Sequence, residues 1–79
     1  MAIFGREMFG RTVLDRTGAT LGTLIDLHVD LNTGSVSELL VQVEEGLDAA
    51  SLPFPTVGSA VAIPAASVAR VASSVHLNR

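Results

Sequence analysis

The 79-residue sequence contains no cysteine, tryptophan, tyrosine or lysine, and its only aromatic residues are three phenylalanines. Without cysteine there is no disulfide framework and no thiolate metal site. With so few rings, the core must be assembled from Val, Leu, Ile and Ala. A chain of this length forms one domain and buries only about 60% of the surface that its unfolded form exposes. Closure of a sheet, or contact with a partner, must therefore bury further apolar surface.

The charge balance argues against nucleic acid as a partner. Eight carboxylates outnumber five positive charges, which gives a formal net charge of -3. A surface that neutralises phosphates needs clustered positive charge, but the positive residues are dispersed along the chain: Arg6, Arg11, Arg16, Arg70 and Arg79. No apolar run approaches the roughly 18 residues of a membrane span, and no secretory signal is recognisable. We expect a cytoplasmic chain with no direct membrane insertion.

Alternation of apolar and polar residues predicts β-strands over about 12–15, 20–31, 35–44 and 59–63, with a final strand over 71–77. In the second strand the alternation predicts an inward row of Ile25, Leu27, Val29 and Leu31. In the third strand it places Leu39, Val41 and Val43 on one face and Val36, Glu38, Leu40 and Gln42 on the other. Gly18 and Gly34 complete turn sequences typical of short hairpins.

The remaining segments are less regular. Pro53 and Pro55 make regular pairing improbable in the loop over 45–57, and residues 64–67 are typical of a tight turn or a single helical turn. No stretch of a dozen residues carries apolar side chains at the spacing of an amphipathic helix. The chain is therefore expected to be all-β, with five or six short strands that remove their unpaired edges by rolling into a small barrel.

The order of these motifs resembles the PRC-barrel domain family. The resemblance covers about residues 11–77 and is carried by Arg11-Thr12-Val13-Leu14-Asp15, Gly18, Leu21-Gly22-Thr23-Leu24-Ile25-Asp26-Leu27, Asp30, Thr33-Gly34-Ser35-Val36, Leu39-Leu40-Val41, Ile63-Pro64, Val68 and Val71. It implies a six-stranded antiparallel β-barrel over 11–79 with an irregular Pro-containing loop, preceded by an N-terminal segment over 1–10. It also implies an adaptor without catalytic apparatus.

Three polar motifs were weighed as chemical sites, and none is favoured. Residues 5–12 differ at one position, Arg11, from the G-x-x-x-x-G-K-[ST] pattern of a phosphate-binding loop. A strand rather than the required helix is expected to follow Thr12. Asp26, His28 and Asp30 alternate along one strand face, where a solvated exterior is a commoner role than metal binding. None of the serines lies in a nucleophile elbow. The sequence therefore predicts no enzyme and no catalytic, cofactor or metal residues.

Apolar residues outside the expected core are the candidates for protein interaction. Phe4, Phe9 and Phe54 fall outside the alternating strands, so they plug the barrel ends, cover an edge or face a partner. Met8 lies in the same N-terminal segment, for which a membrane-surface helix is a weaker alternative because the segment is short and contains Gly5. Leu24, Val36 and Leu40 are expected to be partly outward and to form a patch for dimerisation.

The resemblance is strongest to short stand-alone archaeal PRC-barrel cell-division proteins of the CdpB type, which act with the adaptor SepF and so with the FtsZ ring. It implies a self-associating adaptor at the division site, a homodimer or higher oligomer, that binds SepF or a paralogous PRC-barrel protein. A ribosome-maturation-like or RNA-linked module is the alternative, which the charge balance opposes. A small metal- or ligand-binding barrel is a third hypothesis.

Overall fold

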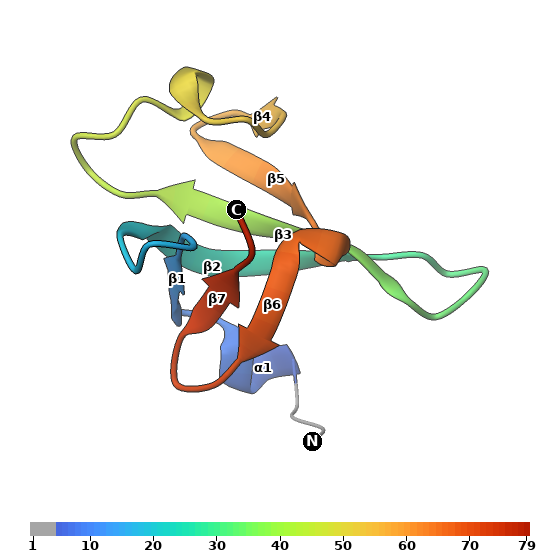
Figure 1. Ribbon diagram of the computed structural model, residues 1–79. Helices are drawn as coiled ribbons and strands as arrows, with labels where there is room; N and C mark the ends of the chain where they lie inside the picture. The colour runs from blue at the N-terminus through green and yellow to red at the C-terminus, as the bar shows by residue number, and fades with distance from the viewer. Residues whose placement is uncertain (1–4) are drawn as a thin grey trace.

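The computed structural model describes residues 5–79, and the all-β class expected from the alternation is confirmed (Figure 1). In this part of the chain one short helix and two 3-10 turns accompany seven strands. Their bounds are α1 Gly5–Met8, β1 Thr12–Leu14, β2 Thr20–Val29, β3 Val36–Val43, η1 Ala49–Ser51, β4 Thr56–Val57, β5 Ala60–Pro64, η2 Ala65–Ser67, β6 Val68–Val71 and β7 Val75–Leu77.

The strands form one sheet in the order β4-β5-β3-β2-β1-β7-β6. All neighbouring pairs are antiparallel except β1 and β7, which run parallel. Within residues 5–79 no pairing joins β4 to β6, so the sheet keeps two edges. The expected closed barrel of six antiparallel strands is therefore corrected to an open mixed sheet of seven. Relative to the five strand ranges expected from the alternation, two strands are additional, because the C-terminal segment folds as two strands, β6 and β7, and Thr56–Val57 forms β4 by pairing with β5.

The sheet is nevertheless strongly curled. β5 lies near one end of the strand order and β6 lies at the other, yet only the three residues of η2 separate them in the chain. η2 packs against β3, and in Figure 1 β6 and β7 cross in front of β2. Three residues cannot span a flat sheet of this width, since neighbouring strands are about 4.8 Å apart. The two ends of the sheet are therefore brought together around a shared core.

That core consists almost entirely of aliphatic side chains. Its members are Val13, Leu24, Leu39, Val41, Phe54, Val61, Ile63, Val75 and Leu77. Val61 and Ile63 are fully buried, as the alternation predicts for this strand. Branched aliphatic residues suit a pleated surface because their restricted side chains pack against neighbours on the same face. The prediction of a core without large rings is thus confirmed, with Phe54 as its single aromatic member.

The inward row expected in the second strand is wrong at three of its four positions, because Ile25, Val29 and Leu31 are exposed and only Leu27 packs against the core. Leu24 lies opposite Val41 and Asp26 lies opposite Leu40, so Ile25 is an extra residue on β2. Such a β-bulge shifts every later side chain to the other face of the sheet. Leu24 is fully buried, whereas Ile25 is 47% exposed. Leu27, beyond the bulge, again packs against the core.

A second bulge lies further along the same hairpin. His28 pairs with Glu38 and Val29 pairs with Val36, which leaves Ser37 unpaired on β3. The bulge reverses the alternation, so Val36 shares the inner face with Leu39 instead of the outer face with Leu40. Beyond this point the hairpin leaves the body of the sheet and extends to the right in Figure 1. We call residues 27–39 the arm.

The turn of the arm matches the sequence prediction. The backbone amide of Gly34 donates to the carbonyl of Asp30 at 2.7 Å, and the Asp30 amide donates to the Ser35 carbonyl at 2.8 Å. Gly34 has a φ of 75°, in the region that glycine adopts without steric cost. Gly18, in the first hairpin turn, has a φ of 90°. Both positive-φ glycines expected from the turn sequences are confirmed.

The final strand expected over 71–77 is wrong, because the chain turns within it. β6 ends at Val71 and β7 begins at Val75, and the Ala72 amide donates to the Ser74 carbonyl at 2.9 Å across the turn. The Arg11 guanidinium donates to the Ala72 carbonyl. Small residues over 72–74 form the turn, and it allows β7 to pair with both β1 and β6.

The Pro-containing loop over 45–57 is largely irregular, as predicted. The Asp48 side chain caps η1 by accepting from the Ala50 amide at 3.0 Å. The Ala62 amide donates to the Pro55 carbonyl at 2.9 Å, which ties the end of the loop to β5. The loop departs from the prediction only at its end, where Thr56–Val57 forms the short edge strand β4.

Candidate protein-interaction surface

An apolar pocket of about 250 Å³ opens where the arm leaves the sheet. It is lined by Met8, Leu27, Val36, Leu39, Ala65, Val68 and Val71. These residues come from α1, the arm, η2 and β6, so the pocket lies between the central β2–β3 hairpin and the edge strand β6. None of the lining side chains carries a charge or a hydroxyl. The site can therefore hold an apolar side chain, but its lining offers no group for acid-base or nucleophilic chemistry.

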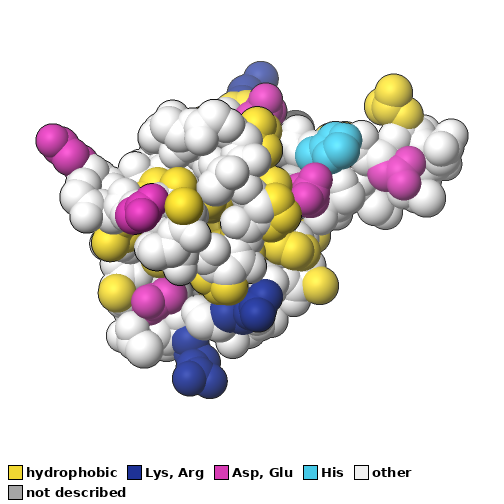
Figure 2. Space-filling model, turned by 90° about the horizontal axis from the view of Figure 1, so that it is seen from above, with side chains coloured by type: hydrophobic (Ala, Val, Ile, Leu, Met, Phe, Trp, Pro, Cys, Tyr) yellow, Lys and Arg dark blue, Asp and Glu magenta, His cyan; other side chains and the backbone are white. Residues whose placement is uncertain are grey.

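The arm beside this pocket has two different faces. On the inner face Leu27 lies opposite Leu39, and Val29 lies opposite Val36. The outer face carries Asp26, His28 and Glu38. Leu31, in the turn, is 93% exposed. Figure 2 shows the arm projecting to the right, with acidic side chains and a histidine along it and a hydrophobic side chain at its tip.

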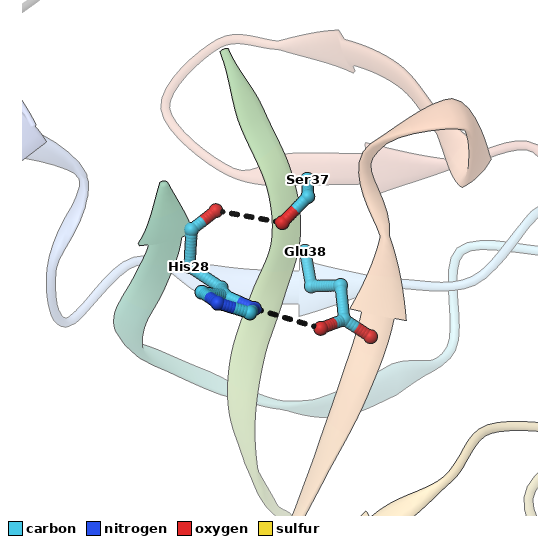
Figure 3. Close-up of polar contacts among 3 residues, drawn as sticks. All are labelled: His28, Ser37 and Glu38. Carbon is cyan, nitrogen blue, oxygen red and sulfur yellow. Dashed lines mark hydrogen bonds and ion pairs between the residues drawn. The ribbon is translucent and has the colours of Figure 1, made fainter. Parts of the chain in front are cut away.

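The polar side chains of the arm are engaged in local structure (Figure 3). His28 Nδ1 lies 3.0 Å from Glu38 Oε1, and the Ser37 hydroxyl donates to the His28 carbonyl at 3.1 Å. The second contact holds the extra residue of the bulge against the opposite strand. Asp26 accepts from the Leu27 amide and Asp30 from the Asn32 amide, each at 2.8 Å. Within residues 5–79 no three His, Asp or Glu side chains are grouped so as to hold a metal ion.

Of the N-terminal interaction candidates, Met8 and Phe9 lie within the described residues, and only Met8 lines the pocket. Met8 is half-buried and lines it, and Phe9, the next residue, is 45% exposed. The Gly10 amide donates to the Leu24 carbonyl at 2.8 Å, which attaches this segment to β2. Phe4 lies outside the described residues. Met8 thus contributes to the apolar wall of the pocket, and Phe9, the next residue in the chain, is an exposed ring.

The patch expected from Leu24, Val36 and Leu40 does not form. Leu24 is a core residue, because the Ile25 bulge places it on the inner face. Val36 is displaced to the inner face by the Ser37 bulge and lines the pocket. Leu40 remains on the outer face, half-buried, opposite Asp26 and Ala62. Of the three, only Val36 contributes to the candidate surface.

Phe54 covers the core, which decides between the roles left open for this ring. It is only 8% exposed and belongs to the core cluster. The Arg79 guanidinium carbon lies 5.7 Å from the ring centroid. Both residues line a second pocket of about 170 Å³ with Asp15, Leu21, Leu52 and Pro53. Phe54 therefore offers no free ring face to a partner in this structure.

Asp15 shapes the turn next to this second pocket. Its Oδ1 accepts from the Thr17 hydroxyl at 2.6 Å, the Ala19 amide at 2.9 Å and the Thr17 amide at 2.8 Å. These donors favour the ionised carboxylate, the Thr17 hydroxyl most of all, and hold the pKa of Asp15 below its ordinary value. The carboxylate has a structural role in the β1–β2 turn.

Sequence reasoning missed the two valines of β6 and the leucine at the arm tip. Val68 and Val71 line the pocket on the same face because Ala69 is an extra residue between them, since Val68 pairs with Leu77 and Arg70 with His76. Leu31 was placed in an inward row. Its position next to the Asn32-Thr33-Gly34 turn was the available signal that it lies beyond the body of the sheet.

The pattern of strands and turns, with a mainly aliphatic core and an apolar pocket, agrees with a comparison against known families. The chain matches the PRC-barrel domain over residues 1–78 and belongs to that family. No curated protein matched the chain in the search of curated proteins. Within the described residues, no helix has the length and apolar character needed to cross a membrane.

Proposed function

We propose that this PRC-barrel protein is a non-enzymatic adaptor that self-associates and binds a protein partner. The observation that carries the proposal is the apolar pocket with the uncovered aliphatic face of the arm beside it. A continuous apolar surface on a small domain is typical of a protein-protein contact. Its lining residues hold no nucleophile, acid or base, which favours binding over catalysis. Membership of a family that is in general non-catalytic supports the same reading.

The partner that we propose is SepF, at the division site in FtsZ-based archaeal cell division, with a paralogous PRC-barrel protein as the second choice. This part of the proposal rests on the resemblance of the strand and turn motifs to short stand-alone archaeal members of the family. Phe9 is the contact that we assign to the partner. Exposed aromatic residues are frequent binding hot spots, and Phe9 is not a pocket-lining residue.

Purified chain and purified SepF provide the direct test, by isothermal titration calorimetry. We expect saturable binding that Phe9→Ser weakens at least about tenfold, the usual effect of losing an aromatic anchor. Leu47→Ser is the matched control, because Leu47 has the same 45% exposure but lies in the loop after β3. Absence of binding to SepF and to the paralogous barrel would reject the proposed partner class.

The RNA-linked alternative makes a different prediction for the same purified protein. An RNA-binding module would retain RNA on a column, and retention would fall steeply with salt because bound cations are released from the phosphates. The net charge of -3 and the dispersed arginines favour no retention at any salt concentration. Salt-sensitive RNA retention together with no SepF binding would favour the alternative instead.

A further inference from the structure

The inner face of the arm is an apolar stripe that the chain itself leaves partly uncovered. The stripe consists of the facing pairs Leu27–Leu39 and Val29–Val36. Leu39 is buried, but Val29 and Val36 are each about two-fifths exposed. The opposite face of the arm carries Asp26, His28 and Glu38. A hairpin that is apolar on one face and acidic on the other has the pattern of a half-buried strand pair, and within residues 5–79 its outer pair, Val29–Val36, is only partly covered.

The two ends of this stripe are complementary to each other. At its base the stripe forms one wall of the apolar pocket, through Leu27, Leu39 and Val36. At its tip Leu31 projects a fully exposed aliphatic side chain. Leu31 lies four positions after Leu27, which corresponds to about 13 Å of extended chain. One arm thus carries an apolar knob at one end and an apolar pocket at the other.

We propose that a second copy of this chain covers the stripe, with the two arms packed antiparallel and Leu31 of each copy inserted into the pocket of the other. The inference rests on the self-association in the proposed function and assigns it to this surface. Two arms of equal length laid side by side in opposite directions bring each tip to the other's base. The contact is then isologous and closes as a two-fold dimer rather than an open filament.

The size of the pocket and the charges around it favour this occupant. Apolar cavities of about 150 Å³ accommodate a benzene molecule, so a pocket of about 250 Å³ has room for a leucine side chain. Stripe-to-stripe packing leaves the acidic outer faces on opposite sides of the dimer, where they do not repel.

The oligomeric state of the full chain tests the proposal, by sedimentation equilibrium from low to high micromolar concentration. We expect a monomer-dimer equilibrium for the wild type. Leu31→Asp should raise the dimer dissociation constant at least about tenfold, because a charge would be forced into an apolar pocket. Leu47→Asp is the matched control, since Leu47 is exposed but lies away from the arm, and it should leave the constant unchanged. Leu31 has no core contacts, so the melting temperature of dilute Leu31→Asp should match that of dilute wild type.

A cross-linking experiment tests the register, using the absence of native cysteine. Chains with Leu31→Cys are mixed with chains carrying Val71→Cys, and disulfide-linked dimers are counted after mild oxidation. Arm exchange predicts that mixed dimers form faster than either homodimer. Chains with Leu47→Cys replace Leu31→Cys as the control and should give no preference for mixed dimers.

Three outcomes would overturn arm exchange. They are a wild-type monomer at high micromolar concentration, a Leu31→Asp variant that dimerises as tightly as wild type, and no preference for the mixed disulfide. Each would assign the pocket to another occupant, either a different protein or residues 1–4 of the same chain. These results are distinguishable from failure of the proposed function. An adaptor that dimerises through another surface still binds SepF, whereas loss of SepF binding leaves the dimer measurement intact.

Discussion

Leu24 lies directly opposite Val41 in the β2–β3 pairing, and both side chains are fully buried, while the next residue, Ile25, is nearly half exposed. The bulge at Ile25 therefore decides which residues of the longest strand enter the core. It moves Leu24 inward and leaves Ile25 outside, the reverse of the simple alternation. Neighbouring residues of almost identical size thus occupy opposite environments, and this difference can be measured.

Truncation of Leu24 should destabilise the protein far more than truncation of Ile25. We expect Leu24→Ala to lower the free energy of unfolding by about 2–5 kcal/mol, because it removes buried methyl groups and leaves a cavity. Ile25→Ala should change it by about 0.5 kcal/mol or less, as for most surface positions. Urea denaturation followed by circular dichroism measures both. Equal losses for the two variants would contradict the bulge.

Gly22 should tolerate no side chain, because it lies in the middle of β2 with strands on both sides. A Cβ at this position would collide with the Gln42 carbonyl oxygen and lie 2.9 Å from the Gln42 carbonyl carbon. We expect Gly22→Ala to cost at least about 3 kcal/mol, since backbone must move to relieve the overlap. Gly18→Ala is the control. It has open space but a positive φ, and it should cost only about 1 kcal/mol. A thermal melt in which both variants shift equally would argue against the close approach at Gly22.

Phe54 should contribute to stability and not to partner binding. Phe54→Ala is expected to lower the free energy of unfolding by about 3–5 kcal/mol, the usual cost of removing a buried ring. Arg79→Ala should cost no more than about 1 kcal/mol, because it removes only a cation-π contact at the surface. Phe54→Leu, which keeps most of the volume, should bind SepF as the wild type does. Reduced SepF affinity in folded Phe54→Leu would show that the ring contacts the partner.

The His28–Glu38 pair should be worth little to stability. The two side chains are 67% and 35% exposed, and exposed ion pairs contribute about 0–1 kcal/mol. A double-mutant cycle with His28→Ala and Glu38→Gln should give a coupling energy within that range. The coupling should also shrink in 1 M salt, where the Debye length falls to about 3 Å. A coupling of several kcal/mol would mean that the outer face of the arm is buried in solution, against the stripe-to-stripe arrangement.

Asp15 should make the β1–β2 turn sensitive to acid. Hydrogen bonds from Thr17 and Ala19 lower the pKa of Asp15 in the folded protein, so the folded state binds the proton less tightly than the unfolded state does. The resulting stabilisation is fully present above the unfolded pKa of about 3.9 and is lost as pH falls through the lower folded value. Asp15→Ala should therefore lower the melting temperature at pH 7 and lose less on acidification than wild type. Thr17→Val should show a smaller change in the same direction, and parallel pH profiles for all three proteins would contradict this role.

Much of the secondary structure was predictable because its signals are local. The bounds expected for the first three strands differ from the observed ones by no more than two residues, and Gly18 and Gly34 adopt the positive φ that their turns require. The helical turn before β6 and the irregular proline loop also followed from residue types. Local backbone preference and alternation carry this information without reference to the rest of the chain.

The bulges and the C-terminal turn were not predictable in the same way. A single extra residue at Ile25 or Ser37 changes the face of all later residues, and its place depends on which residues of the opposite strand it pairs with. For this reason alternation predicted Leu24 outside the core and grouped Val36 with Leu40 on one face, and both predictions are wrong. The turn over 72–74 interrupts a run that alternates without a break, so alternation alone could not reveal it.

The sequence by itself determined an all-β domain of the PRC-barrel family, a mainly aliphatic core without a disulfide, and a charge that disfavours nucleic acid. Only the tertiary structure decided that the sheet stays open between β4 and β6, and that Met8, Val36, Val68 and Val71 line one apolar pocket. It also decided that the alternating row ending in Leu31 runs outside the core. The physical reason is that burial depends on strand register and on which segments meet across the curled sheet, and both are set by contacts between residues far apart in the chain.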